Sequence, residues 1–177
     1  GYLDIVTSSW DLDVGLNYFK NDQHGGFTNE SKSSRLNDLK GGLNLLQMDF
    51  NNDGCRDIFV LRGAWLRGNY GKQPNSLIKN NGDGTFTDIT TQSGLLSFHP
   101  TQTATWNDFN NDGWVDVFIG NETWEGNAAS GAHPCELYLN NRDDTFTNVA
   151  EAAGCAMTGF IKGVTSGDFD NDGWQDI

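Results

Sequence analysis

One nine-residue segment occurs three times in this chain with nearly the same sequence, at residues 49–57, 108–116 and 168–176. The first copy reads Asp-Phe-Asn-Asn-Asp-Gly-Cys-Arg-Asp, and successive copies start 59 and 60 residues apart. Oxygen-bearing side chains recur at positions 1, 3, 5 and 9, and glycine recurs at position 6. A repeat of fixed period indicates an array of one supersecondary unit. We call the three segments acidic loops 1, 2 and 3.

Each acidic loop holds at least three carboxylates, which repel one another unless a cation lies among them. Ca²⁺ takes roughly six to eight oxygen ligands, whereas Mg²⁺ needs a tighter octahedron and Zn²⁺ prefers Cys and His. We therefore predict about three Ca²⁺ sites, each completed by the backbone carbonyl of position 7. The predicted ligands are Asp49, Asn51, Asp53, Cys55 and Asp57; Asp108, Asn110, Asp112, Trp114 and Asp116; Asp168, Asp170, Asp172, Trp174 and Asp176; and Asp4, in the ninth position of an earlier loop.

An EF-hand begins with the same ligand pattern, but it needs a glutamate at position 12 and flanking helices. Position 12 is Val60 in loop 1 and Ile119 in loop 2, and both loops run into strand-like apolar segments. The sequence therefore argues against an EF-hand. Acidic turns that bind no metal remain the alternative.

The repeat extends beyond the acidic loops. Phe-Thr pairs start at residues 27, 86 and 146, each after a polar turn that follows strand-like residues, which indicates a β-hairpin. One unit then has four strands, a to d, predicted at residues 42–48, 57–61, 76–80 and 85–89 in the first complete copy. Four strands at this period are typical of propeller blades. We predict an all-β propeller of four-stranded antiparallel blades.

The predicted blades divide the chain as parts of one propeller domain. Residues 1–41 form a partial blade (strands b to d), residues 42–100 and 101–160 form two complete blades, and residues 161–177 start a further blade. Because a closed propeller needs about four blades or more, we expect the chain to be a fragment of a longer protein. Open blade edges invite association, so self-association is a further expectation.

The motif of residues 108–119 and the turn of residues 80–88 resemble the FG-GAP/VCBS repeats of integrin-alpha-type β-propellers. The Ser-Gly-Leu and Ala-Ala-Gly segments that follow the hairpins are similar to those of the bacterial ASPIC/UnbV family. The resemblance implies a secreted or surface propeller, usually seven-bladed, that serves adhesion or recognition, with enzymes a minority. The chain departs from the family pattern in blade number and at Arg142.

The charge and the cysteines bear on location. The net charge is −13 with 11 basic residues, which argues against nucleic acid as a partner. Loops of this kind fill where Ca²⁺ is millimolar, outside the cytosol, and no apolar run predicts membrane insertion. We expect an extracellular, cell-surface or periplasmic location.

Cys135 and Cys155 could form a disulfide across a hairpin or remain small buried thiols, with Cys55 left over.

Length variation separates the two faces of the predicted propeller. The count from each Phe of strand d to the next acidic loop is always 22, whereas the count from each ninth-position Asp to that Phe is 23, 29 or 30. Insertions therefore fall in the connections between strands b and c, opposite the acidic loops. Insertions on one face often mark a binding surface. These connections carry Trp10, Trp65, Tyr70, Trp124 and His133, with Arg62 and Arg67 nearby.

Exposed Trp, Tyr and Arg are common interface anchors, and tryptophan also stacks on sugars, although these aromatic residues could instead pack between blades. We therefore favour a Ca²⁺-stiffened module that binds a protein or a glycan. An enzyme acting on carbohydrate, a lyase or hydrolase using Glu122, Glu125 or His133, is one alternative, but no nucleophile motif predicts catalytic residues. A building block of a cell-surface assembly is the other.

Overall fold

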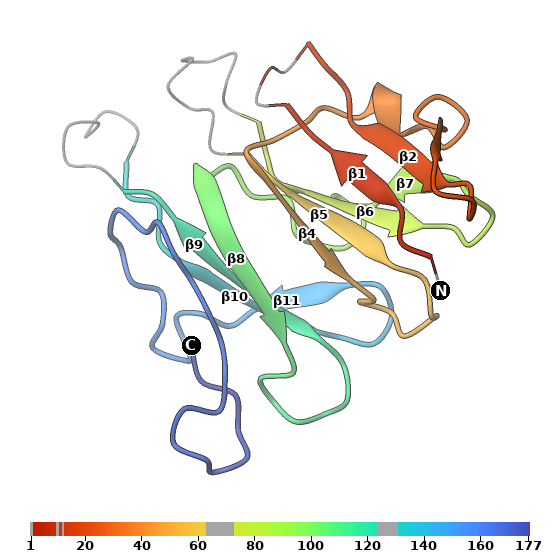
Figure 1. Ribbon diagram of the computed structural model, residues 1–177. Helices are drawn as coiled ribbons and strands as arrows, with labels where there is room; N and C mark the ends of the chain where they lie inside the picture. Colours follow the sequence, from red (N-terminus) through yellow and green to blue (C-terminus); the bar gives the residue numbers. More distant parts are fainter. Residues whose placement is uncertain (1, 10, 12, 63–72, 124–130) are drawn as a thin grey trace.

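The computed structural model describes residues 2–9, 11, 13–62, 73–123 and 131–177, and its strands form three antiparallel sheets (Figure 1). Sheet 1 contains β1 (Ile5–Thr7), β2 (Asn17–Asn21) and β3 (Phe27–Asn29). Sheet 2 contains β4 (Asn44–Met48), β5 (Asp57–Leu61), β6 (Ser76–Asn80) and β7 (Phe86–Asp88). Sheet 3 contains β8 (Thr101–Asn107), β9 (Asp116–Asn121), β10 (Glu136–Asn140) and β11 (Phe146–Asn148). One short 3₁₀ helix, η1 (Leu36–Asp38), lies between β3 and β4.

Each strand pairs with the next one along the chain, so every sheet is an up-and-down meander. This is the topology of a propeller blade, and the predicted fold class is confirmed. Sheet 2 reproduces the predicted strand order a to d, with β5 and β6 at the predicted bounds. Sheet 1 has three strands, in the order β1-β2-β3. Residues 161–177 contain one antiparallel bridge, between Gly167 and Asp176.

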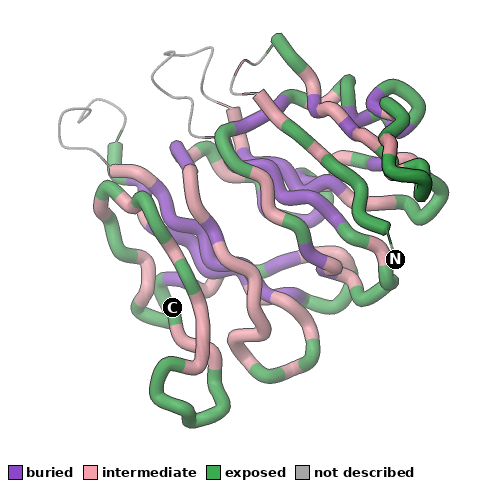
Figure 2. The backbone as a smooth tube through the Cα atoms, viewed as in Figure 1, coloured by how far each residue is buried: buried purple, intermediate pink, exposed green. Residues whose placement is uncertain are grey.

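The core lies between the sheets, because strand b of each complete blade is buried on both faces (Figure 2). In β5, Ile58 and Val60 join a cluster shared with sheet 1, and Phe59 and Leu61 join a cluster shared with sheet 3. The second cluster contains Trp106, whose ring makes an edge contact with Phe59 at 5.5 Å between centroids. Side chains alternate across a strand, so one apolar strand supplies two interfaces.

A third cluster covers the outer face of sheet 3. It contains Phe118, Cys135 and Leu137, and residues from the segment after β11 pack over it, including Cys155 and Ile161. All three cysteines of the chain are free thiols in this structure. Cys135 and Cys155 therefore share an apolar cluster without the disulfide that the sequence left open. Burial raises the pKa of both thiols, which lowers their reactivity.

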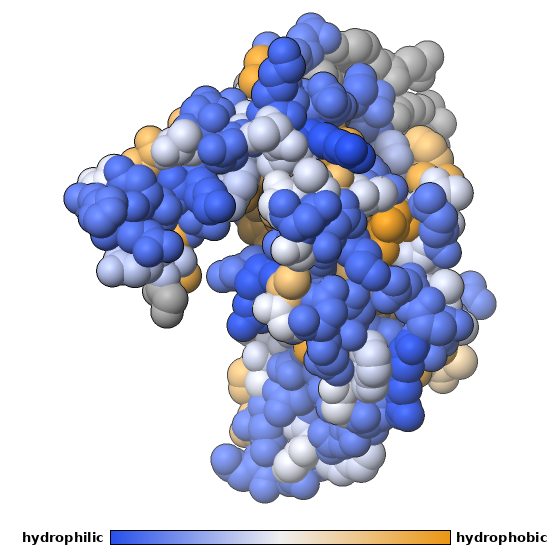
Figure 3. Space-filling model, turned by 90° about the vertical axis from the view of Figure 1, so that its right-hand side faces the viewer, coloured by the Kyte–Doolittle hydropathy of each residue, from blue (hydrophilic) through white to orange (hydrophobic). Residues whose placement is uncertain are grey.

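One face of the molecule is mainly polar (Figure 3). The face shown in Figure 3 is largely hydrophilic, with small hydrophobic areas separated from one another, in keeping with the acidic composition. Within the described part of the chain, no helix has the length and hydrophobicity needed to cross a membrane.

Candidate metal centre

The three acidic loops adopt the same backbone conformation. The asparagine at position 4 has a positive φ in every loop, at Asn52 (56°), Asn111 (55°) and Asn171 (63°). The glycine at position 6 also has a positive φ, between 85° and 89°. Asparagine and glycine are the residues that tolerate this left-handed conformation best. The recurrent Asn and Gly therefore allow a tight loop, in which positions 1, 3, 5 and 9 carry the oxygen-bearing side chains.

The aspartate at position 1 binds the backbone of its own loop. In loop 1, Asp49 accepts hydrogen bonds from the amides of Asp53 (3.1 Å) and Gly54 (2.9 Å). Loop 2 repeats both bonds from Asp112 and Gly113 to Asp108, and loop 3 repeats them to Asp168. The side chain at position 3 accepts a second bond from the position-5 amide in all three loops. Oxygen atoms are thus held in the same order three times.

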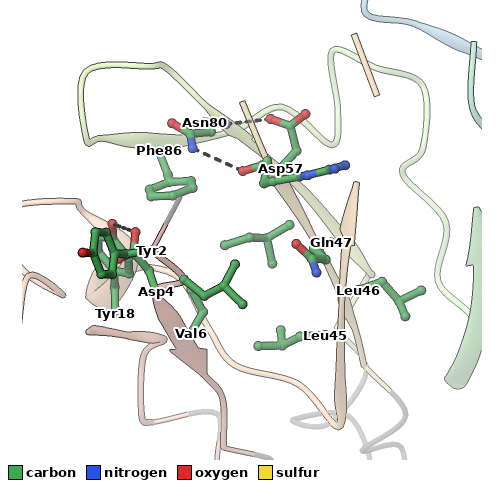
Figure 4. Close-up of a pocket in the computed structure, with 13 residues that line it drawn as sticks. Tyr2, Asp4, Val6, Tyr18, Leu45, Leu46, Gln47, Asp57, Asn80 and Phe86 are labelled. Carbon is green, nitrogen blue, oxygen red and sulfur yellow. Dashed lines mark hydrogen bonds between the residues drawn. The ribbon is translucent and has the colours of Figure 1, made fainter. Parts of the chain in front are cut away.

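In loops 1 and 2, the aspartate at position 9 connects the loop to the hairpin of strands c and d. Asp57 accepts the amide hydrogen of Asn80 at 2.8 Å (Figure 4). It also accepts the amide hydrogen of Phe50 at 3.2 Å. In sheet 3, Asp116 accepts the equivalent pair from Phe109 and Asn140. Each oxygen atom of a carboxylate has two lone pairs, so both groups retain acceptor capacity for a cation.

The asparagine that ends strand c was not singled out by the sequence. Its amide binds the ninth-position aspartate, and its side-chain nitrogen donates to the carbonyl of position 8, at Arg56 for Asn80 and at Val115 for Asn140. In sheet 1, Asn21 makes the same pair of bonds, to Asp4 and to the Leu3 carbonyl. The signal that could have identified it is an asparagine at the same point of every hairpin turn.

Two of the ninth-position aspartates, Asp57 and Asp116, are costly to ionise without a nearby cation. Asp57 and Asp116 are both fully buried, and burial raises the pKa of each carboxyl to about 6. Backbone amide hydrogen bonds lower these pKa values, and the other aspartates of each loop raise them. A divalent cation within the loop would offset both the burial and the repulsion.

In loop 3, carboxylate oxygens of Asp168, Asp170 and Asp176 lie within 4.8 Å of one another. Positions 1, 3 and 9 therefore converge there. The same three positions are Asp, Asn and Asp in loops 1 and 2, so an amide oxygen replaces one carboxylate. A hard-oxygen donor set of this kind fits Ca²⁺, and it lacks the nitrogen and sulfur ligands that favour Zn²⁺.

Neighbouring loops also contact each other. Asn52 of loop 1 donates its side-chain amide to the carbonyl of Gly113 in loop 2, at 3.1 Å. Asn111 of loop 2 donates in the same way to Gly173 in loop 3, also at 3.1 Å. The position-4 asparagine of one loop thus binds the position-6 carbonyl of the next, which joins the three loops along one face.

Two basic side chains lie close to the acidic loops. Arg142 forms an ion pair with Asp112 of loop 2, at 2.9 Å between nitrogen and oxygen. Lys79 of β6 pairs with Asp144, in the turn between β10 and β11, at 2.6 Å. Partial burial raises the pKa of Asp112, but hydrogen bonds from Arg142 and the Trp114 amide outweigh it, so the pKa lies below its usual value.

On the opposite face, the structure buries two residues that the sequence placed near the binding loops. His133 is 5% exposed, and its Nδ1 atom lies 2.8 Å from that of His99. Arg62 is 4% exposed and donates to the carbonyls of Lys40, Gly41 and Pro74. Both residues therefore lie beneath this face rather than on it. Trp10, Trp65, Arg67, Tyr70 and Trp124 lie outside the described residues.

A cavity of about 430 Å³ lies between sheets 1 and 2 (Figure 4). Tyr18 and Phe86 contribute rings that meet edge to face at 6.0 Å between centroids. The hydroxyl group of Tyr18 donates to Asp4 at 2.7 Å. Asp57 also lines this cavity, so acidic loop 1 borders it.

Comparison with known proteins places these repeats in a family. A family model described as the FG-GAP-like repeat matches residues 49–119 and again residues 108–177. The two matches begin at the first aspartates of loops 1 and 2, and together they cover more than half of the chain. The chain belongs to the FG-GAP-like repeat family. The predicted resemblance is confirmed, and strands β5 to β11 lie within the matched residues.

Two curated relatives share sequence with this FG-GAP-like chain. Cartilage acidic protein 1 of Xenopus tropicalis is 32% identical over 139 residues, which is 77% of this chain and 19% of the relative. Cartilage acidic protein 1 of Homo sapiens is 35% identical over 103 residues, 56% of this chain and 14% of the relative. The chain thus spans less than a fifth of the length of these relatives.

Proposed function

We propose that this chain is part of an extracellular β-propeller that binds one Ca²⁺ ion in each acidic loop and uses the resulting rigid scaffold for recognition. The observation that carries the calcium proposal is the threefold recurrence of one hydrogen-bonded loop with oxygen side chains at four fixed positions. The ion would supply charge neutralisation and cross-linking between strands a and b. Millimolar Ca²⁺ outside cells would keep such sites filled.

The location rests on composition and family. The relatives are named as acidic proteins of cartilage, and this chain is also acidic, with a net charge of −13. The chain also belongs to the FG-GAP-like repeat family, and the resemblance of its repeats to those of integrin-alpha-type propellers implies a role in recognition. These points support an extracellular recognition module.

Replacing a central ligand tests the ligand assignment. Asp112→Ala removes the fifth-position carboxylate of loop 2, where both strands of the blade and both neighbouring loops are present. We expect bound Ca²⁺ to fall by one ion per chain in isothermal titration calorimetry at saturating Ca²⁺. Asp83→Ala is the control, because Asp83 lies in a hairpin turn and binds Thr85 of that turn. Unchanged stoichiometry in Asp112→Ala would show that the ligands are misassigned.

The recognition surface is proposed on the face opposite the acidic loops. We expect Trp65→Ala and Trp124→Ala each to weaken binding to a protein or glycan ligand by at least about tenfold, because a few aromatic anchors carry most of the energy of an interface. Binding is measured on glycan arrays and on immobilised extracellular-matrix proteins in millimolar Ca²⁺. Trp174→Ala is the matched control, because Trp174 is an exposed tryptophan in acidic loop 3. An equal loss of affinity in Trp174→Ala would show that the ligand binds the face of the acidic loops instead.

A further inference from the structure

The hairpin turn of sheet 3 departs from that of sheet 2 at two positions. In sheet 2, Gly82 and Gly84 occupy the left-handed conformation, with φ of 76° and 88°. In sheet 3, the same positions hold Arg142 (φ 67°) and Asp144 (φ 66°). Positive φ is uncommon for residues other than glycine, asparagine and aspartate. An arginine in this conformation therefore calls for a physical reason.

The substituted side chains both make ion pairs. Arg142 binds Oδ2 of Asp112, the fifth-position ligand of loop 2, and Asp144 binds Lys79 of sheet 2. The backbone of the turn is otherwise the same, because the Arg142 amide binds Asn140 just as the Gly82 amide binds Asn80. The position of Arg142 thus sets a guanidinium group beside one acidic loop.

Loop 1 has no such group at this place. A side chain at Gly82 would begin 3.5 Å from the Sγ atom of Cys55 in loop 1, so the two turns lie against their loops in the same way, but glycine carries no charge. Among the described residues, an arginine or lysine forms an ion pair with Asp112 and not with Asp53 or Asp172. Lys79 attracts Asp53 of loop 1 without forming an ion pair with it. Loop 2 therefore differs from loops 1 and 3, among the described residues, in the direct ion pair at its position-5 aspartate.

We propose that Arg142 is a resident cation that competes with Ca²⁺ for acidic loop 2 and makes this the weakest of the three sites. The inference rests on the proposed calcium function. The guanidinium group forms a charge-assisted hydrogen bond with one oxygen of Asp112, and it repels any dication that approaches the same carboxylate. In water-like surroundings, repulsion between a monovalent and a divalent cation a few ångströms apart changes affinity by about tenfold. The side chain of Arg142 is 54% exposed, so added salt reduces the effect.

The consequence is an ordered response to calcium. Loops 1 and 3 fill first, and loop 2 fills only at a Ca²⁺ concentration about tenfold higher. Loop 2 lies between the other two and binds both through Asn52 and Asn111. Its filling would therefore complete the chain of loops along this face in a second step.

The amide hydrogens of the position-6 glycines report each loop separately. Gly54, Gly113 and Gly173 each donate to the first aspartate of their own loop, at 2.8 to 3.0 Å. We would titrate the whole ¹⁵N-labelled chain with CaCl₂ and follow these three amides by NMR. The expected midpoint for Gly113 is about tenfold higher than those of the other two.

Substitutions then isolate the arginine. Arg142→Gly restores the residue of the sheet 2 turn, and we expect the Gly113 midpoint to fall about tenfold, whereas Arg142→Lys keeps the charge and should leave it close to the original value. Asp144→Gly is the matched control, because it relaxes the same turn and breaks the ion pair with Lys79 but leaves Arg142 on Asp112. The Gly113 midpoint should then change by less than about twofold.

The outcomes separate this inference from the calcium proposal. If none of the three glycine amides shifts with Ca²⁺, the proposed function fails. If all three shift but Gly113 responds at the same or a lower Ca²⁺ concentration than the others, the role of Arg142 is overturned. That role is also overturned if Arg142→Gly leaves the Gly113 midpoint unchanged or weakens the site, since Arg142 would then orient Asp112 for the ion.

Discussion

Removal of Ca²⁺ with EGTA is expected to lower the free energy of unfolding by about 8 kcal/mol if three sites are filled. An ion that binds only the folded state stabilises it by about 2.7 kcal/mol per site when its concentration is a hundredfold above Kd. Without the ions, the carboxylates of each loop repel one another. The buried carboxyl groups of Asp57 and Asp116 are then also costly to ionise, because no cation offsets their loss of solvation. For a chain of this size, each kcal/mol corresponds to about 2–4 °C, so the melting temperature should fall by roughly 15–30 °C.

The measurement is thermal unfolding followed by circular dichroism, in millimolar Ca²⁺ and in EGTA. Because the chain carries a net charge of −13, any added salt screens its self-repulsion and stabilises it to some degree. The control therefore replaces CaCl₂ with MgCl₂ at the same ionic strength, in a background of about 0.1 M NaCl, where the Debye length is about 10 Å. A melting curve that EGTA does not move would exclude Ca²⁺ as a structural ion.

Arg62→Met is expected to lower the free energy of unfolding by about 3–5 kcal/mol. The guanidinium group donates to the carbonyls of Lys40 and Gly41, in the connection between sheets 1 and 2, and to Pro74 and Ser76 at the start of β6. Methionine has a comparable volume but no donor. The three carbonyl groups would lose their partner, and each such loss costs about 1–3 kcal/mol.

Urea unfolding monitored by tryptophan fluorescence, in saturating Ca²⁺, measures this loss. Lys32→Met is the control, because Lys32 is exposed and replacing it removes the same charge at the surface. The control should change the free energy of unfolding by less than about 0.5 kcal/mol. A loss below about 1 kcal/mol in Arg62→Met would show that water replaces the missing donors. Water would then reach these carbonyl groups more easily than the 4% exposure of Arg62 indicates.

Most of the fold was predictable because its signals are local and repeated. The apolar run of β5 and the oxygen-rich loop before it lie next to each other in the chain, so their pattern is visible without knowledge of the fold. The constant count of 22 residues between strand d and the next acidic loop placed both turns on one face. The Asp57–Asn80 and Asp116–Asn140 hydrogen bonds agree with that placement.

Contacts between blades were not predictable, because they join residues about 60 positions apart. The bond from Asn52 to Gly113 depends on how one blade lies beside the next, which the sequence of either loop alone does not reveal. Arg142 stood out only as a departure from the family pattern. Its pairing with Asp112 needs the three-dimensional position of a turn relative to a loop.

The buried polar residues His133 and Arg62 illustrate the same limit. His133 and Arg62 are polar and lie next to long connections, so the sequence favours exposure. Their burial follows from the packing of a histidine against His99 and of a guanidinium group among carbonyls, which are long-range contacts. A polar side chain can be buried where partners satisfy it, and only the fold shows where those partners are.

The sequence by itself determined the repeating unit, the four strands of a blade and the order of oxygen-bearing side chains in each acidic loop. Each of these is set by the chemistry of neighbouring residues, and three copies made the pattern unambiguous. The tertiary structure decided how the loops join along one face, which loop carries a resident cation and which polar residues are buried. These properties depend on surfaces that meet only after the blades have packed, and no local pattern encodes them.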